Sequence, residues 1–302
     1  MKLKYMVQNI DDNKLVKDIL IKNLNISHSL LITFKKNNCI FLNGINAFVF
    51  SSVHENDELI VSLDYEEDNS NIIPTKMDLN IVFEDDCYLI IDKPASISVH
   101  PSIMHYSDSL SNGVRNYFDE IGLKKKIRPV NRIDKDTSGL VIFAKNEYIQ
   151  ECLIKQMNCN KFLKEYIAIV EGKFDIKKGL INAPIGRKEN SIIERCIVED
   201  GKPSITHYEV LFEKQIQDFY YSIIKCTLET GRTHQIRVHM SYINHPLLGD
   251  DLYGGNTNFI KRQALHSCKI SFYHPINNNL VTYESCIPND LLSFFNKNTI
   301  ST

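Results

Sequence analysis

The sequence lacks several features that would assign it to a functional class at once. No apolar run is long enough to span a bilayer, and the first residues carry no signal-peptide segment, so we expect a cytosolic protein without a membrane partner. The eight cysteines form no CxxC pair, which argues against a zinc knuckle or a redox dithiol and favours reduced thiols. No GxxxxGK[ST] segment occurs, which excludes a P-loop NTPase at the level of motifs.

An excess of one charge is also missing, since the net charge of −2 gives no overall attraction to nucleic acid. Charge is nevertheless uneven, because residues 121–145 hold seven lysines and arginines against two aspartates. Such a segment could form a cationic groove for phosphates. The run Lys124–Lys126 could equally be a solvated lysine face, and both interpretations stay open here.

The length of 302 residues suits two domains, and local patterns divide the chain unevenly. We predict a small domain over 1–64, a linker over 65–77 and a second domain over 78–302. The linker prediction rests on residues 64–76, which are polar, acidic and interrupted by a proline, as flexible connections are. The expected elements of the first domain are helices over 15–24 and 29–36, the second capped by Ser27, a hairpin turn at Asn43-Gly44, and a strand between 53 and 63.

The second domain has more strands than helices, and the two do not alternate regularly. This order favours an α+β fold with a mixed, mainly antiparallel sheet over a doubly wound parallel sheet. We expect helices over 109–120 and 147–157, a hairpin formed by 81–83 and 88–91, and strands over 129–133, 140–144, 166–170, 206–212 and 220–228.

The most informative stretch is residues 128–140, which read RPVNRIDKDTSGL. A β-branched run ends at Arg132-Ile133-Asp134, a tight polar turn follows to Gly139, and a new apolar strand begins. The pattern predicts that Arg132 and Asp134 stand at the exit of a rigid strand, where active-site groups are often placed. Taken alone, Asp134 could simply cap the turn, and Arg132 could be a surface cation.

Three further segments carry polar groups in settings of the same kind. Asp92-Lys93-Pro94 precedes Val99-His100-Pro101 at a strand end, where we expect Lys93 and His100 to be structural supports. Lys164–Ala168 opens an apolar strand. In the segment 230–239, Gly231 breaks a strand and Thr233 is expected to cap a helix that runs to about residue 243. Arg232 would then lie before a helix N-terminus, a place that favours anions.

With these four segments, residues 78–290 resemble an RluA-type RNA pseudouridine synthase. Asp134–Gly139 with Arg132 fits the central motif of that family, and Lys164–Ala168 and Gly231–Arg237 fit the other two. Leu248-Gly249-Asp250 with Tyr253-Gly254 fits the end of the last motif. The N-terminal unit resembles a small RNA-binding domain first recognised in a ribosomal protein. The chain departs from the family at Asn131, usually a histidine, at Ile133, usually a leucine, and at His28, where an arginine commonly follows the serine.

The resemblance implies an enzyme that isomerises uridine in RNA to pseudouridine. The N1–C1′ bond breaks, the base rotates and C5 bonds to C1′, so no cofactor is required. Asp134 corresponds to the essential aspartate, which attacks the sugar or assists formation of a glycal. Arg232 is expected to pair with it and to lower its pKa, and Tyr166 to pack on the base and help remove the C5 proton. Arg132 would fill the space of the flipped base, with Thr137, His234, Gln235 and Arg237 as further RNA or base-flipping contacts.

Two other classes of function remain to be weighed. The protein could be a catalytically inactive RNA-binding or ribosome-assembly factor on the same fold. It could instead be a sugar hydrolase that uses Asp134 with Asp136. A metal site is not expected, because His234 and His239 lie five residues apart on a helix without a third ligand. We expect a monomer whose substrate is ribosomal RNA of the large subunit, with transfer RNA as the alternative.

Overall fold

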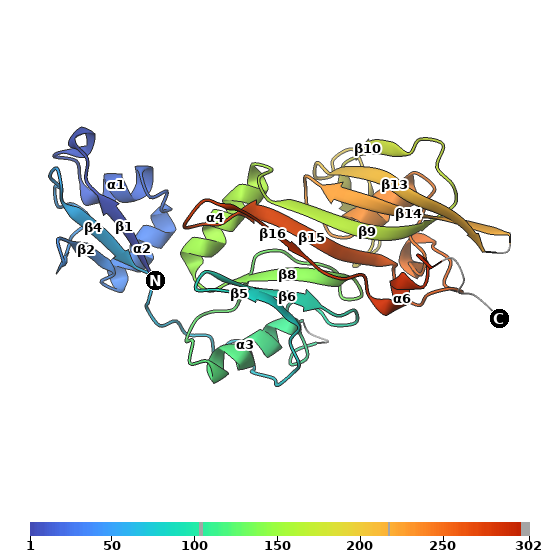
Figure 1. The fold of residues 1–302 in the computed structure, drawn as a ribbon, viewed down its shortest axis with the longest axis horizontal. Helices are drawn as coiled ribbons and strands as arrows, with labels where there is room; N and C mark the ends of the chain where they lie inside the picture. The colour runs from blue at the N-terminus through green and yellow to red at the C-terminus, as the bar shows by residue number, and fades with distance from the viewer. Residues whose placement is uncertain (103–104, 217, 297–302) are drawn as a thin grey trace.

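The structure is a computed structural model that describes residues 1–102, 105–216 and 218–296. Figure 1 shows a small unit at one end of the molecule, beside α4, and a long twisted sheet that extends away from it. The small unit holds a four-stranded sheet in the order β1-β4-β2-β3. Its elements are β1 (Lys2–Met6), η1 (Asn9–Asp11), α1 (Val16–Lys22), α2 (His28–Lys36), β2 (Ile40–Leu42), β3 (Ile45–Asn46) and β4 (Glu58–Ser62).

Local signals in the N-terminal unit have the structural consequences expected of them. The hydroxyl of Ser27 accepts a hydrogen bond from the backbone N–H of Leu30 at 3.1 Å, which confirms the predicted cap of α2. Asn43 and Gly44 have φ of 51° and 81°, the left-handed values that a two-residue hairpin turn requires. Both predicted helices and the hairpin are therefore confirmed.

The second sheet has ten strands, in the order β10-β13-β14-β9-β15-β8-β6-β5, with β16 beside β15 and β7 beside β8. Within the part of the chain that the structure describes, only the β15–β8 pair is parallel, so the predicted α+β fold with a mainly antiparallel sheet is confirmed. The elements are β5 (Ile81–Glu84), β6 (Tyr88–Lys93), α3 (Leu110–Glu120), β7 (Arg128–Pro129), β8 (Ser138–Ala144), α4 (Glu147–Asn158), β9 (Leu163–Glu171), β10 (Lys178–Asn182), β11 (Ile185–Arg187), β12 (Arg195–Ile197), β13 (Ile205–Ile216), β14 (Phe219–Leu228), α5 (Gln235–Tyr242), η2 (Asp251–Tyr253), β15 (Leu265–Tyr273), β16 (Leu280–Glu284) and α6 (Asn289–Leu292).

Strand β8 runs through the middle of the core, and all seven of its residues are buried. Its two faces belong to different apolar clusters. Val141 and Phe143 pack with α3, while Leu140 and Ile142 share a cluster with α4 and with the N-terminal unit. Burial on both faces explains why this strand reads as a continuous apolar run.

The polar segment that follows the N-terminal unit contains no helix or strand, but it is anchored along the second domain. The ammonium group of Lys125 donates to the backbone carbonyls of Leu63, at 2.7 Å, and Tyr65. Arg128 forms a two-pronged ion pair with Glu67, in which both side chains are nearly buried. Lys125 and Arg128 of the basic segment therefore bind the acidic linker rather than a ligand, whereas Lys124 and Lys126 are exposed to solvent.

Two of the expected elements differ from the structure near the motifs that contain Asp134 and Arg232. Strand β7 ends at Pro129 rather than at residue 133, because the side chain of Asn131 takes over the contacts to β8. Its amide donates to the carbonyl of Leu140 at 3.0 Å and accepts from the N–H of Ile142 at 2.9 Å. Helix α5 begins at Gln235, one residue later than the expected cap at Thr233 implies, and no side chain caps it. Within the described residues, no helix has the length and apolarity needed to cross a membrane.

Candidate active site

The loop between β7 and β8 carries Asp134, and buried contacts fix its shape. Lys93, at the end of β6, is fully buried, and its ammonium group donates to the carbonyls of Lys135 at 2.8 Å and Pro94 at 2.7 Å. Burial lowers the pKa of Lys93 to about 7. The N–H of Thr137 donates to the carbonyl of Asp134 at 3.1 Å and closes the turn. The aspartate is thus held in a constrained loop rather than at the exit of a strand.

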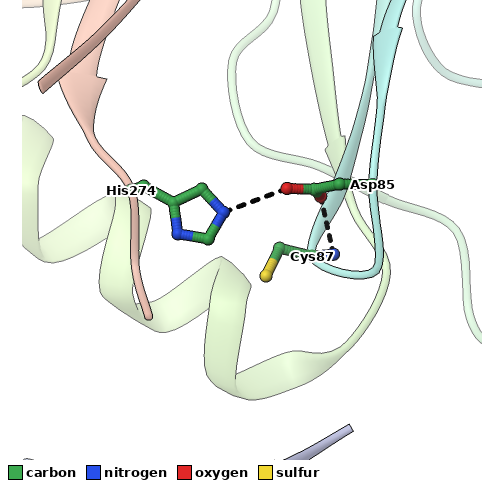
Figure 2. Close-up of side chains that lie close together, drawn as sticks. All are labelled: Asp85, Cys87 and His274. Atoms are coloured by element: carbon green, nitrogen blue, oxygen red, sulfur yellow. Dashed lines mark hydrogen bonds and ion pairs between the residues drawn. The ribbon is translucent and has the colours of Figure 1, made fainter. Parts of the chain in front are cut away.

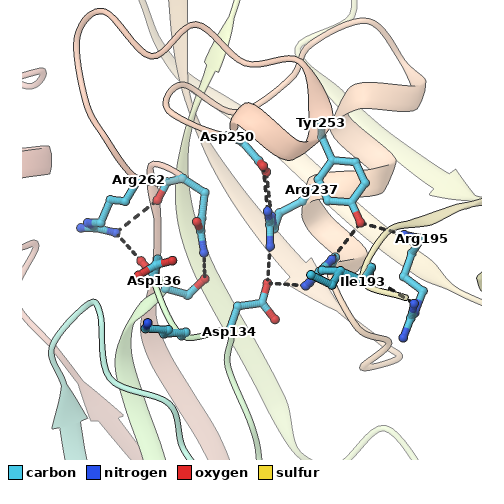
Figure 3. Close-up of polar contacts among 12 residues, drawn as sticks. Asp134, Asp136, Ile193, Arg195, Arg237, Asp250, Tyr253 and Arg262 are labelled. Carbon is cyan, nitrogen blue, oxygen red and sulfur yellow. Dashed lines mark hydrogen bonds and ion pairs between the residues drawn. The ribbon is translucent and has the colours of Figure 1, made fainter. Parts of the chain in front are cut away.

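The carboxylate of Asp134 lies against the guanidinium group of Arg237 (Figure 3). The distance from Nη1 of Arg237 to Oδ2 of Asp134 is 3.2 Å. The other edge of the guanidinium group binds Asp250 in two-pronged fashion, at 2.7 Å from Nε and 2.8 Å from Nη2. The side chain of Asp250 is fully buried, whereas that of Asp134 is 25% exposed. The arrangement presents one ionisable carboxylate to the surface and keeps its partner inside.

The charge of Arg237 is fixed by its surroundings. Burial acts to lower the pKa of Arg237, but the hydrogen bonds and charges of Asp250 and Asp134 outweigh it and raise that pKa. The guanidinium carbon also lies 5.0 Å from the centre of the Tyr253 ring. A rigid two-pronged pair with a buried acid therefore leaves one N–H of Arg237 aimed at Asp134.

Arg232 is not the partner of Asp134, which corrects the pairing expected from the sequence. Its side chain is exposed, and its Nε donates to the carbonyl of Pro203 at 3.1 Å. Arg232 precedes α5 in the turn after β14, whereas Arg237 lies on the buried face of that helix and points at Asp250. The turn directs Arg232 along the surface of the cleft, and the helix directs Arg237 inward.

Tyr166 on β9 faces the same region from the sheet. Its side chain is buried, and it lies beside Ser267 in the register of β9 and β15. Burial raises the pKa of the Tyr166 phenol, and the charge of Asp134 adds to the increase. The phenol is therefore protonated at neutral pH in this structure.

A cavity of about 830 Å³ brings the separate motifs together. Its walls come from the segments 99–100, 129–134, 157–166 and 228–233, which are far apart in the sequence. Asp134, Tyr166, Arg232 and Arg132 all line it, so the expected convergence of the motifs in one cleft is found. Asp136 lines neither this cavity nor the smaller one beside Asp134 among the described residues, which disfavours a hydrolase built on the two aspartates.

Arg132 lines the large cavity, and His234 lines the smaller cavity beside Asp134. Arg132 is exposed, and its charge lowers the pKa of His100 in addition to the larger effect of burial. His234 adopts a left-handed conformation with φ of 58°, and its Nδ1 lies 2.8 Å from the hydroxyl of Tyr253. Burial lowers the pKa of His234 against the opposing charge of Asp134, so the ring is neutral at pH 7.

Thr137 and Gln235 do not line the large cavity, although both border the smaller cavity beside Asp134. The Thr137 hydroxyl is buried and accepts a hydrogen bond from the amide of Gln263 at 3.2 Å. The Gln235 amide accepts from the N–H of Arg232 at 3.0 Å and donates to the carbonyl of Ile205 at 2.9 Å. Because these groups are engaged within the protein, they support the loops that line the cleft and offer little to a ligand.

Two side chains of this site received no role from the sequence. Asp250 holds Arg237, and Tyr253 accepts a hydrogen bond from the N–H of Arg195 at 3.0 Å while it contacts His234 (Figure 3). Both fall in the short glycine-containing segment after α5, which matched the last motif. That match was the available signal, but it did not tell which arginine the carboxylate would bind.

One group of three residues among those described has the composition of a metal site. Asp85, Cys87 and His274 bring one ligand atom each within 4.8 Å of the others (Figure 2). However, Asp85 accepts hydrogen bonds from the N–H groups of Cys87 and Tyr88 and from Nε2 of His274, at 3.0 Å for the last. Nδ1 of His274 accepts from Ile276 at 3.2 Å. The group therefore connects the β5–β6 turn to the end of β15 through hydrogen bonds.

Comparison with known proteins gives consistent matches across most of the chain. A family model described as RNA pseudouridylate synthase matches residues 87–242, a range that contains every residue lining the large cavity. The chain is 35% identical over 289 residues to the uncharacterized RNA pseudouridine synthase YhcT of Bacillus subtilis, covering 96% of this chain and 95% of that protein.

Two further relatives extend this result. The ribosomal large subunit pseudouridine synthase D of Neisseria meningitidis is 35% identical over 280 residues, which cover 88% of this chain and 73% of that protein. The solved structure of human RNA pseudouridylate synthase domain containing 1 superposes with a TM-score of 0.59 at 25% identity. That match covers 72% of this chain and 86% of the human one.

Proposed function

This chain belongs to the RluA-type RNA pseudouridine synthases, and we propose that it acts on the RNA of the large ribosomal subunit. Membership of the family makes it an isomerase that converts uridine in RNA to pseudouridine. The choice of ribosomal RNA is supported by relatives such as the Neisseria enzyme, whose name specifies the large subunit. An enzyme with that substrate works in the compartment where ribosomes are assembled.

The observation that carries the assignment of the site is the pair of Asp134 with Arg237 on the wall of the large cavity. Breaking the N1–C1′ bond leaves positive charge at C1′, and an ionised carboxylate beside the sugar stabilises it or bonds to it. Asp134 is partly exposed and its guanidinium partner is permanently charged, which suits this role. Both routes, attack on the sugar and formation of a glycal, use the same carboxylate.

Tyr166 and Arg132 supply the remaining contacts in this proposal. The base leaves the RNA stack to reach Asp134, and the ring of Tyr166 packs on it at the back of the cavity. Arg132 is exposed at the mouth and has a long, flexible side chain that can occupy the place of the flipped base. Thr137, His234 and Gln235 then hold the walls of the cleft.

The proposed reaction balances without any added reagent. One C–N bond breaks, one C–C bond forms at C5, and the proton lost from C5 is balanced by the proton gained at N1.

Release of tritium from uracil labelled at C5 tests the proposed substrate. The purified protein is incubated separately with large-subunit ribosomal RNA and with transfer RNA, both synthesised with the label. We expect tritium release from the ribosomal RNA. Release from transfer RNA alone would contradict the proposed substrate. Free uracil would indicate a hydrolase, and binding without release of tritium from either RNA would indicate an inactive RNA-binding protein.

A further inference from the structure

A second cationic group lies in the large cavity and takes no part in holding Asp134. Lys164 stands two residues before Tyr166 on β9, so both side chains lie on the same face of the strand. Lys164 lines the cavity and is only 8% exposed. Among the described residues, its ammonium group has neither a hydrogen-bond acceptor nor a carboxylate within ion-pair distance.

A buried ammonium group without a partner is unusual, because burial penalises the charged form. Burial lowers the pKa of Lys164, and the positive charge of Arg232 lowers it further. No carboxylate acts in the opposite direction on this pKa. The protein therefore brings two cations together and supplies no anion between them.

The position of the two cations relative to each other follows from the turn after β14. A Cβ atom placed on Gly231 would lie 3.3 Å from the ammonium nitrogen of Lys164, so this nitrogen lies against the backbone next to Arg232. Nε of Arg232 donates to the carbonyl of Pro203, and its two terminal nitrogens have no hydrogen-bond acceptor among the described residues. Glu229, also on the cavity wall, pairs with His207.

We propose that Lys164 and Arg232 form a binding site for one phosphate of the RNA backbone, next to the nucleotide that enters the cavity. A phosphodiester carries the single negative charge that the two cations lack, and it accepts hydrogen bonds from both. This inference rests on the proposed action on RNA, and it adds a contact site for one backbone phosphate beside the target nucleotide. It also gives Arg232 a role at the rim of the cleft, where Arg237 already holds Asp134.

The salt dependence of RNA binding tests the site. A short single-stranded oligouridylate is titrated with the wild-type protein and with Lys164→Met, Arg232→Met and the double variant. Loss of one phosphate contact lowers the slope of log K against log salt concentration by about 0.7 for a single strand. The double variant should lose this amount, and neither single variant should lose more, because the two side chains share one phosphate. Lys173→Met, which changes an exposed lysine just beyond the other end of β9, should leave the slope unchanged.

Thermal stability separates a phosphate site from a structural lysine. Lys164→Met replaces a buried, unpartnered charge by an apolar side chain, so the melting temperature should stay the same or rise. Lys164→Arg keeps the charge and should restore most of the wild-type slope. An unchanged slope in the Lys164→Met and double variants, or a lower melting temperature in Lys164→Met, would overturn the proposal.

Two further arms identify the source of the phosphate and separate this inference from the proposed function. If inorganic phosphate binds in a way that needs Lys164 while the slope for RNA does not change, the site takes a free anion and the assignment to RNA is wrong. In an RNA that the wild type converts, a neutral methylphosphonate linkage beside the target uridine should weaken binding to the wild type but not to the double variant. A changed slope without tritium release from any RNA would leave the phosphate site supported and the proposed function rejected.

Discussion

Two lysines of this protein are buried to the same extent and do opposite things. Lys125, in the basic segment, is 7% exposed, and Lys164, in the cleft, is 8% exposed. Lys125 donates to the carbonyls of Leu63 and Tyr65 and lies 4.4 Å from the centre of the Tyr65 ring. Lys164 has no such partner among the described residues. The first lysine fastens the linker, and the second leaves its charge available to a ligand.

The electrostatic surroundings reinforce the difference. Burial lowers the pKa of both lysines, but the carboxylates of Glu67 and Asp64 oppose the effect at Lys125. At Lys164 the neighbouring Arg232 adds to it. The density of basic residues along the sequence would place an anion site in the segment around Lys125. The contacts of the two side chains instead favour the cleft, because only Lys164 has no partner there among the described residues.

The largest effect is expected from Arg237→Met, which removes the charge between two carboxylates. Asp250 would remain buried without a partner, so the free energy of unfolding should fall by roughly 3–5 kcal/mol, and turnover should be lost. Urea denaturation and tritium release measure the two effects. Arg232→Met is the matched control and should leave stability unchanged. A stable Arg237→Met variant with normal turnover would show that the two arginines have been assigned the wrong roles.

The next effect concerns the cations that bind the linker. Glu67→Gln breaks the nearly buried pair with Arg128 and should lower the free energy of unfolding by roughly 3 kcal/mol. The salt dependence of RNA binding should not change, since neither Glu67 nor Arg128 lines the cavity. Urea denaturation and a salt titration of RNA binding check both statements. A reduced slope would mean that the basic segment also contacts RNA.

The smallest effects are expected when single lysines of the basic segment are replaced and compared with Lys164→Met. Lys125→Met leaves two carbonyls without their donor and should cost about 1–3 kcal/mol in stability, with RNA binding intact. Lys124→Gln removes only an exposed pair with Glu66 and should change stability by less than about 0.5 kcal/mol. Thermal denaturation of these variants beside Lys164→Met measures the contrast. Equal changes in melting temperature for Lys125→Met and Lys164→Met would contradict the proposed difference between the two lysines.

The elements that could be predicted are those governed by short-range rules. The cap at Ser27, the hairpin turn at Asn43-Gly44 and the buried run of β8 each depend on neighbours in the sequence. The loop before Asp134 could not be predicted, because β7 ends early when the side chain of Asn131 bonds to the backbone of β8. Here a side chain replaces the backbone hydrogen bonds between two strands, and this depends on a contact to a residue eleven positions away in the sequence.

The candidate site was predictable as a set of segments but not as a set of contacts. Four motifs indicated that Asp134, Tyr166 and Arg232 belong together, and one cavity holds them. Of the two arginines of the last motif, Arg232 was expected to pair with Asp134, but the structure pairs Arg237 with it. The choice between them depends on Asp250, whose buried carboxylate orients Arg237 from a different loop. Long-range partners of this kind leave no local pattern.

The central claim is that the carboxylate of Asp134, held by Arg237, is the group that acts on the sugar. Tritium release from C5-labelled RNA in a single turnover, with the protein in excess, tests it most directly in the Asp134→Asn variant. The account predicts that release falls by at least about 1,000-fold while RNA binding is retained. Release at the wild-type rate from Asp134→Asn would contradict it.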